Sequence, residues 1–259
     1  MNKKGLHSIE DFSGLGKADV HIHTNHSDGK PTVLQVLEYA ENRTDLDIIA
    51  ISDHDTMDGY FEARQLMKVK KYRFELIPAE EITSSKGHIL GLFLEKSIRG
   101  GMDAKDTVKE IHAQGGLAVA CHPFEKTRWN NQNRPMMNGV GYKTLREIGH
   151  GFDGIEVINA TPTLGDENYR AAMINKLLMQ SEMGDSDAHI VEAIGKGYTL
   201  FEGKTAKHFK KAIVQHQTRA MSNKWTVLAL VKYAYFFMPH ALRILWNTIL
   251  HGKTKLPKE

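Results

Sequence analysis

Two histidines, His21 and His23, lie in the segment DVHIHTNHSDG, which spans Asp19 to Gly29. Alternate residues of a strand share one face, so the two imidazoles point the same way and can hold a metal ion between them. A lone H-x-H pair is more often two solvated or core histidines, because short motifs specify function loosely. The pair therefore predicts a metal site only where further ligands converge on it.

Acidic and histidine residues recur at the expected carboxyl ends of later strands. In α/β barrels these ends and their loops form the active-site face, so side chains far apart in sequence meet there. Burying such groups together is costly without divalent cations, and a mixed nitrogen and oxygen set suits Zn²⁺, Mn²⁺ or Fe²⁺. So many candidates fit two or three ions better than one. They are Asp53, His54, Asp55, Glu80, Glu81, His122, Asp187 and His189.

The elements that position these residues alternate along most of the chain. The strand-like ADVHIH precedes the helix-like PTVLQVLEYAENR, and DIIAISD precedes MDGYFEARQLMKVKK. This alternation of strands and helices predicts an α/β fold with βα units and a mostly parallel sheet that is closed or nearly closed into a barrel. An open doubly wound sheet is the alternative. His88 begins the run GHILGLF instead of following it, which indicates an irregular or antiparallel element there.

The segments DVHIHTNHSDG, ISDHDT, PAEEIT, GHILGL, CHPF, IEVINA and GDSDAH, taken in order, resemble the polymerase and histidinol phosphatase (PHP) domain family over residues 17–201. The resemblance implies a distorted (β/α)7 barrel with a trinuclear metal site. It is closer to the stand-alone phosphoesterases of the family, including enzymes that act on nucleoside 3′,5′-bisphosphates. It therefore implies that metal-activated hydroxide hydrolyses a small phosphomonoester, a nucleotide-like substrate or a cyclic phosphodiester.

The resemblance also implies which residues hold the ions. Glu81, rather than Glu80, matches the bridging carboxylate because it directly precedes Ile-Thr, and Glu81, Asp187 and His189 are expected to act directly in hydrolysis. The first ion would be held by His21, His23, Glu81 and Asp187, the second by Glu81, His88 and His122, and the third by Asp28, His54 and His189.

Substrate contacts are expected from the polar segment EKTRWNNQNRPMMNGVG, which is too long for an ordinary connection and is interpreted as a functional loop or lid. Its Lys126 and Arg128 are candidate phosphate ligands, with a solvated loop as the equal alternative. Asn159 ends the run GIEVIN on the same side and is a third candidate. Asp19 and Asp53 are either acceptors that orient imidazole N–H groups or residues that close turns.

Composition indicates a folded, soluble protein. The 259 residues are 41% hydrophobic and 25% charged, which excludes disorder over most of the length. Cys121 is the single cysteine, so no intramolecular disulfide forms, and the first residues lack the apolar stretch of a secretory signal. We therefore expect a cytoplasmic location. No apolar run is long enough to cross a bilayer.

The net charge of +3 is distributed unevenly. From Gly203 onward there are eleven Lys and Arg against one acid, Glu259, so this part carries +10 and residues 1–202 carry −7. We expect a phosphoesterase barrel over residues 1–222 and a basic amphipathic tail over residues 223–259, with two helices broken at Pro239. The tail either packs on the barrel or a sister subunit, contacts an anionic membrane peripherally, or contacts a nucleic-acid backbone.

Two alternatives to a small-substrate hydrolase stay open at this stage. The first is a nuclease or nucleic-acid-binding module that uses the same metals, with the tail along the backbone. The second is a metal-stabilised scaffold without catalysis, which the complete ligand set disfavours. Because the tail contains none of the candidate ligands, its deletion is expected to leave turnover intact.

Overall fold

A single curved sheet of nine strands forms the centre of the molecule. The computed structural model describes residues 14–125, 128–129, 135–136 and 138–251. Along the chain, the strands of this sheet are β1 (Leu15–Asp19), β2 (Ile48–Ile51), β3 (Glu75–Ser84), β4 (Gly87–Leu92), β5 (Leu117–Ala120), β8 (Gly154–Asn159), β9 (Ser181–Asp185), β10 (Gly197–Glu202) and β11 (Arg219–Ser222). Their order across the sheet is β11-β10-β1-β2-β3-β4-β5-β8-β9.

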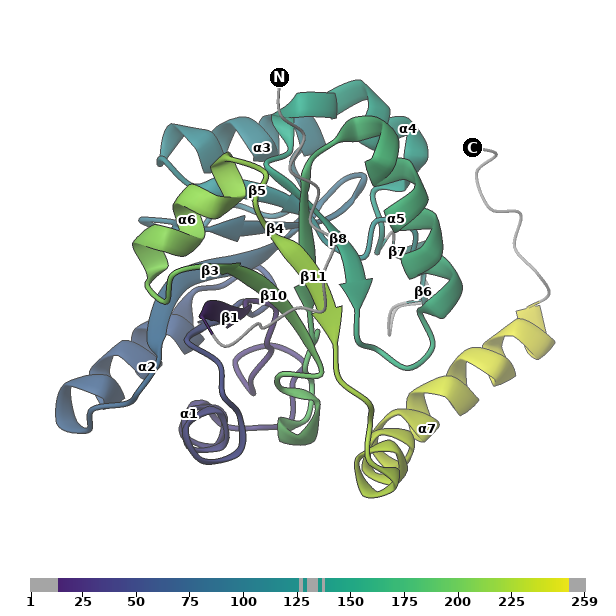
Figure 1. Cartoon of the computed structure of the whole chain (residues 1–259). Coiled ribbons are helices and arrows are strands. Elements are labelled where there is room, and N and C mark those ends of the chain that lie inside the picture. The colour runs from purple at the N-terminus through teal and green to yellow at the C-terminus, as the bar shows by residue number, and fades with distance from the viewer. Residues whose placement is uncertain (1–13, 126–127, 130–134, 137, 252–259) are drawn as a thin grey trace.

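The two outermost strands of this order meet again in space. A Cβ atom at Gly184 of β9 would lie 2.8 Å from the backbone nitrogen of Met221 in β11, so only glycine permits this approach. The sheet is therefore a nearly closed barrel (Figure 1). The predicted distorted α/β barrel is confirmed.

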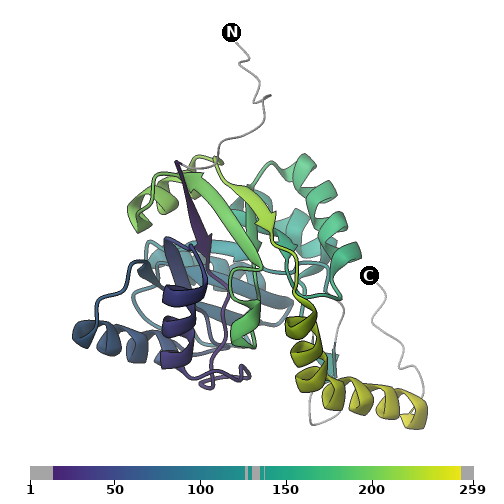
Figure 2. The ribbon, with the colours of Figure 1, turned by 60° about the horizontal axis from the view of Figure 1, so that its bottom comes forward.

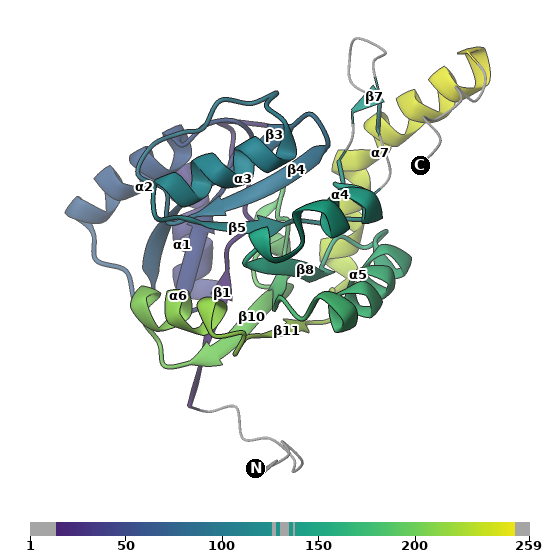
Figure 3. The ribbon, with the colours of Figure 1, turned by 90° about the horizontal axis from the view of Figure 1, so that it is seen from above.

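Helices cover the outside of the barrel, as the view from above shows (Figure 3). A separate pair of short strands, β6 (Arg128–Trp129) and β7 (Pro135–Met136), lies after β5, and the 3₁₀ turns are η1 (Gly149–Gly151) and η2 (Val191–Ala193). The helices are α1 (Val33–Arg43), α2 (Asp58–Val69), α3 (Ala104–Ala113), α4 (Gly141–Ile148), α5 (Gly165–Leu178), α6 (Ala206–Val214) and α7 (Val227–His251).

Local sequence explains where these elements begin and which face they bury. The Thr32 hydroxyl accepts a hydrogen bond from the backbone N–H of Gln35, whose side chain accepts one from the backbone N–H of Thr32, a capping box that fixes the start of α1. The helix buries Val33, Val36, Leu37 and Ala40, which share one face at helical spacing. All four residues of β2 are apolar and buried, as in a strand covered on both faces.

The sheet is only half parallel. The pairs β1–β2, β2–β3, β5–β8 and β8–β9 are parallel, whereas β3–β4, β4–β5, β1–β10 and β10–β11 are antiparallel. The expectation of a mostly parallel sheet is therefore wrong: β4 returns from β3 in a hairpin, and β10 and β11 also pair antiparallel although α6 connects them. The antiparallel direction inferred from His88 is correct: the start of β4 lies where β3 and β5 end.

The tail is one helix by its backbone, not the two that were expected. Pro239 lies inside α7, which runs from Val227 to His251 and bends along its length (Figure 2). A proline removes one hydrogen bond from a helix and kinks it without always ending it. Among the described residues, no helix is long and apolar enough to cross a membrane. The division at residues 222 and 223 falls between β11 and α7 and stays a prediction.

Candidate metal centre

His21 and His23 follow β1 in an extended segment rather than lying on the strand itself, which ends at Asp19. The segment is held by two backbone hydrogen bonds to Ala188. The N–H of His23 donates to the carbonyl of Ala188 at 2.9 Å, and the N–H of Ala188 donates to the carbonyl of His21 at 3.1 Å. This pairing brings the segment beside Asp187, which precedes Ala188. Both imidazoles turn to the same carboxylate, Glu81, as the alternation of an extended chain requires.

Four side chains gather around the first predicted ion position. The Nε2 atoms of His21 and His23 lie 3.1 and 3.2 Å from Glu81 Oε2. They lie 3.7 and 3.3 Å from Asp187 Oδ1. Ligand atoms around a tetrahedral ion with bonds of about 2.0–2.1 Å are about 3.3 Å apart, so these spacings fit one ion.

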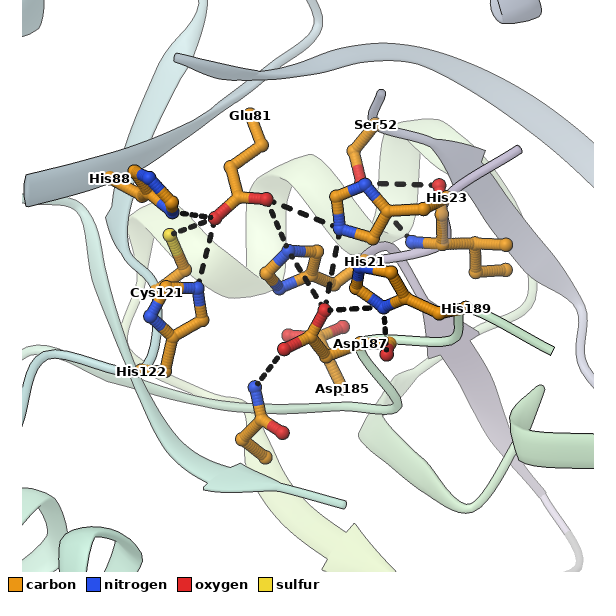
Figure 4. Close-up of polar contacts among 12 residues, drawn as sticks. His21, His23, Ser52, Glu81, His88, Cys121, His122, Asp185, Asp187 and His189 are labelled. Carbon is orange, nitrogen blue, oxygen red and sulfur yellow. Dashed lines mark hydrogen bonds and ion pairs between the residues drawn. The ribbon is translucent and has the colours of Figure 1, made fainter. Parts of the chain in front are cut away.

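The Glu81 carboxylate faces two groups of histidines, one with each oxygen (Figure 4). Its Oε1 atom lies 2.8 Å from His88 Nδ1 and 2.9 Å from His122 Nε2. Its Oε2 atom faces His21 and His23. Glu81 is therefore placed to share one ion position with each group, as a bridging carboxylate would.

The third group surrounds Asp28 at the open side of the cluster. Asp28 Oδ1 lies 3.1 Å from His189 Nε2 and 3.8 Å from His54 Nε2. The other ring nitrogen of His54, Nδ1, lies 3.3 Å from Glu81 Oε2, so His54 stands between this group and the bridging carboxylate. All nine expected ligands thus lie in one continuous cluster, in groups of three or four that could each hold an ion.

Glu80 points away from the cluster. Its two oxygens accept hydrogen bonds from the Ser97 hydroxyl at 2.7 Å and from the backbone N–H of Ile98 at 2.8 Å. Adjacent residues of a strand face opposite sides, so only one of the two glutamates in PAEEIT can reach the histidines. The structure places Glu81 there, and Glu80 instead fixes the connection that follows β4.

Glu156 supports the cluster and was missed in the sequence. It is fully buried on β8; its Oε1 lies 3.0 Å from His21 Nδ1, and its Oε2 accepts the backbone N–H of His122 at 2.6 Å. A carboxylate at the second ring nitrogen fixes the tautomer and orientation of a ligand histidine. The signal was available, because a glutamate interrupts the otherwise apolar run GIEVI.

Asn159 supports Asp187 instead of facing an open pocket. Its side-chain amide donates to Asp187 Oδ2 at 3.0 Å and to Glu156 Oε2 at 3.1 Å, while its oxygen accepts the N–H of Thr161. These contacts use the amide donors and the carbonyl, so the structure does not favour the predicted phosphate contact. Of the two other candidates, Lys126 and the side chain of Arg128 lie outside the described residues, and both contacts stay predictions.

Among the described contacts, Asp19 and Asp53 accept hydrogen bonds from loops rather than from imidazoles, so the structure disfavours the first of the two roles considered for them. Asp53 accepts hydrogen bonds from the N–H and hydroxyl of Thr24, at 2.7 and 2.6 Å, and from the Ser27 hydroxyl at 2.6 Å. Asp19 accepts the N–H groups of Ser186 and Gly195. They fix the two loops that carry Asp28 and Asp187, so each acts on the site through one of these loops.

Backbone strain also occurs at the ligands. His122 and Asp187 have φ angles of 27° and 50°, in the left-handed region that side chains other than glycine rarely adopt. Such conformations cost about 1–3 kcal/mol each and persist where the surroundings enforce them, most often at functional sites. Here the hydrogen bonds of Glu156 and Asn159 hold both residues, which aims their side chains into the cluster.

Buried ring nitrogens test whether the cluster suits metal ions. Within the described part of the chain, His21 Nε2, both nitrogens of His23 and of His88, and His122 Nδ1 are buried without a hydrogen-bond partner. Unpartnered buried polar atoms are rare in proteins and call for a ligand such as an ion. Divalent ions held between these nitrogens and the shared carboxylates would supply the missing partners, so the residues fit divalent cations.

Charge within the ion-free cluster leads to the same conclusion. Burial alone would lower the pKa of His23 and of His122, but the facing carboxylates outweigh it and raise these values to about 10 and about 9. Burial dominates at His54, whose pKa falls to about 4. Burial opposes ionisation of Glu81, yet the surrounding histidines hold its pKa well below the usual range. Positive charge is therefore favoured at the centre of the site, where protons stand in for cations.

Comparison with known proteins supports this description. The family model described as PHP-associated matches residues 165–218. An uncharacterized protein of Methanocaldococcus jannaschii is 31% identical over 175 residues, which cover 63% of this chain and 92% of that protein. The phosphoribosyl 1,2-cyclic phosphate 1,2-diphosphodiesterase of Eggerthella lenta is 36% identical over 89 residues, 30% of this chain and 31% of that enzyme.

Solved structures share the fold at lower identity. A two-domain protein of Bacteroides vulgatus, described as containing a predicted PHP-like metal-dependent phosphoesterase, has a TM-score of 0.64 at 20% identity, over 86% of this chain and 70% of that one. A lesion-specific endonuclease of Pyrococcus furiosus has a TM-score of 0.56 at 15% identity, over 85% and 66%.

Fold and cluster together define an α/β barrel that carries a cluster of histidines and carboxylates suited to divalent metal ions. The chain belongs to the PHP domain family.

Proposed function

We propose that this protein hydrolyses a small phosphorylated substrate, either a phosphomonoester or a cyclic phosphodiester, at a site for three divalent ions. One observation carries the proposal: Glu81 presents one oxygen to each of two histidine groups, and a third group adjoins it through His54. When bound, the divalent ions lower the pKa of a coordinated water and neutralise the oxygens of the reacting phosphoryl group. The set of nitrogen and oxygen ligands suits Zn²⁺, Mn²⁺ or Fe²⁺.

Exposure of the ligands indicates the side from which substrate enters. The side chains of His21, His23 and Glu81 are at most 1% exposed, whereas those of His54 and Asp28 are 25% and 60% exposed. Water is thus excluded from the bridging carboxylate and reaches the third group. The phosphoryl group would therefore approach along Asp28 and His54, and the buried ligands would hold their ions without direct contact to bulk water.

A small substrate is favoured by what borders this opening. The ring of Phe237 in α7 lies edge-on to the ring of His189, with centroids 5.8 Å apart, and so borders the third group. The cyclic phosphodiesterase of Eggerthella lenta, a relative over part of its length, acts on a small cyclic phosphodiester by its name. These two points support a small phosphoester, either a monoester or a cyclic diester.

A nuclease is the second candidate because of the basic tail and the fold shared with the endonuclease of Pyrococcus furiosus. A screen with Mn²⁺ should separate the two. It would compare phosphomonoesters, nucleoside bisphosphates, cyclic phosphodiesters and oligonucleotides of increasing length. The proposal expects the highest kcat/KM on a small ester with weak salt dependence. Preference for longer oligonucleotides with a steep loss of binding as salt rises would instead establish the nuclease.

A further inference from the structure

Helix α7 is anchored at the mouth of the metal centre by a row of aromatic rings. The indole Nε1 of Trp225 donates to the carbonyl of Ala160 at 2.8 Å, and its ring lies 5.4 Å from that of Tyr233. Tyr233 stacks on Phe237 at 4.4 Å, and Phe237 meets the ring of His189. Tyr233 and Phe237 are four residues apart, so one face of the helix makes these contacts. That face is the inner face of α7.

The opposite face of α7 is apolar and open to solvent. Intervals of four, four, three and four residues place five large apolar side chains on one stripe, turned away from the inner face. Soluble monomers rarely expose a contiguous apolar patch of this kind without a partner. The stripe, called here the outer stripe, consists of Val227, Val231, Tyr235, Met238 and Leu242, which are between 53% and 79% exposed.

The apolar surface continues from the outer stripe toward the metal centre. A groove of about 900 Å³ lies between α1, η2 and α7, with Val231 and Tyr235 on its α7 side and Tyr39 on its α1 side. Ile190, another lining residue, directly follows the candidate ligand His189 in the chain. A partner covering the outer stripe would therefore lie close to the entrance of the site.

Charge identifies the kind of partner that fits. No acidic residue occurs in α7, and the chain from Gly203 onward has a net charge of +10. Lys232 pairs with Glu192, but Lys224 before the helix and Arg243 within it add positive charge that no acid in α7 offsets. A second copy would set two strongly positive tails against each other, which disfavours self-association. The apolar side chains of the outer stripe offer no charged or polar contact to a nucleic-acid backbone. An anionic bilayer offers apolar chains and negative headgroups together.

We propose that α7 docks this protein on an anionic lipid bilayer, with the outer stripe at the level of the headgroups and the helix axis in the plane of the surface. The helix would lie on the bilayer and not cross it, because no helix among the described residues is both long and apolar enough to span a membrane. Because Phe237 ties the same helix to His189, docking holds the entrance of the metal centre beside the membrane. The proposal does not depend on which phosphoester is hydrolysed.

Vesicle flotation of the full-length protein tests this inference. Binding to vesicles of phosphatidylcholine with phosphatidylglycerol is expected to exceed binding to phosphatidylcholine alone and to weaken as salt rises. The double variant Val231→Asp with Tyr235→Asp should bind at least about tenfold more weakly, because two charges replace apolar side chains at the interface. The matched control is Val69→Asp with Tyr169→Asp, at exposed positions of α2 and α5, which should bind like the wild type.

Melting temperature and ion content, measured on all three proteins, exclude unfolding as the cause of lost binding. Equal loss in the control variant, or no salt-sensitive binding by the wild type, would overturn the proposal. Light scattering after size exclusion adds one more outcome. A dimer that the Val231→Asp, Tyr235→Asp variant abolishes, without vesicle binding by the wild type, would assign the outer stripe to a second copy and also overturn membrane docking.

Discussion

At the residue scale, the position of one carboxylate organises the site. Glu81 is buried, and its two oxygens lie between 2.8 and 3.3 Å from nitrogens of five histidines. Removing one oxygen would leave one of the two proposed ion positions without its shared ligand. Its neighbour Glu80 is equally buried but binds Ser97 and Ile98. Substitution of Glu80 is therefore the control for substitution of Glu81.

The first prediction uses this pair. Glu81→Gln should abolish phosphoester hydrolysis, because an amide nitrogen replaces one of the two coordinating oxygens. Glu80→Gln should retain most activity and lose mainly stability, because one of its two hydrogen bonds is weakened. Steady-state rates and melting curves of both variants check this. Reversed effects would show that Glu80 is the bridging residue.

Glu156 leads to the second prediction. Its oxygens receive the N–H of His122, the amide of Asn159 and the ring nitrogen of His21, and glutamine offers a single acceptor for these donors. Glu156→Gln should weaken metal affinity about 10- to 100-fold, the usual effect of losing such a supporting partner. Competition with a chelator measures the affinity. Glu182→Gln, an exposed glutamate on β9, is the control and should leave affinity unchanged.

The sequence predicted the residues of the cluster more completely than the residues that hold the cluster in place. His, Asp and Glu at strand ends are conspicuous in sequence, and their spacing on an extended chain fixes the shared face. The roles of Asp19, Asp53 and Asn159 depended on loop conformation and on partners more than a hundred residues away in some cases, such as Ser186 for Asp19. No local pattern encodes such pairings, so the sequence left two roles open for Asp19 and Asp53, and the phosphate contact predicted for Asn159 is one that the structure does not favour.

At the element scale, periodicity predicted most helices and strands, and direction was harder to infer. Only His88 revealed that β4 is antiparallel, because a ligand at the start of a strand must lie at the end of its neighbours. The sequence did not predict that the tail would form one bent helix, because a proline either ends or kinks a helix depending on how the helix packs. The tail also touches the site through Phe237, so the expectation that it is separate from the chemistry was incomplete.

That contact gives a prediction for α7. Phe237→Ala should lower kcat/KM for a soluble phosphoester about 2- to 12-fold, since aromatic contacts are worth about 0.5–1.5 kcal/mol and His189 loses the ring that orients it. Phe236→Ala removes the neighbouring ring, which does not contact His189 among the described contacts, and should leave kcat/KM unchanged. Equal effects of the two substitutions would show that Phe237 acts through the stability of α7 and not through His189.

At the scale of the whole molecule, the barrel brings together charges that are stable only with cations among them. The ion-free protein keeps His23 and His122 protonated at neutral pH, because their pKa values are raised to about 10 and about 9. Metal ligands must be neutral imidazoles. Ion uptake at neutral pH should therefore release protons, and metal affinity should rise with pH until it passes these two values.

Calorimetric titration of ion-free protein with Zn²⁺ or Mn²⁺ checks this fourth prediction. The titration is repeated in two buffers of different ionisation enthalpy. The difference between the two apparent binding enthalpies gives the number of protons released, which should be at least one per chain. Identical heats in the two buffers would mean that the histidines are already neutral without ions. The carboxylates would then not raise their pKa values as the arrangement of charges implies.

The central claim is that nine side chains form one site for several ions, and counting those ions tests it most directly. Elemental analysis of protein reconstituted with Mn²⁺ or Zn²⁺ and freed of excess metal should give two to three ions per chain. Glu81→Gln should bind fewer, because its carboxylate serves two positions. Fewer than one ion per chain in the wild-type protein after reconstitution would contradict the account.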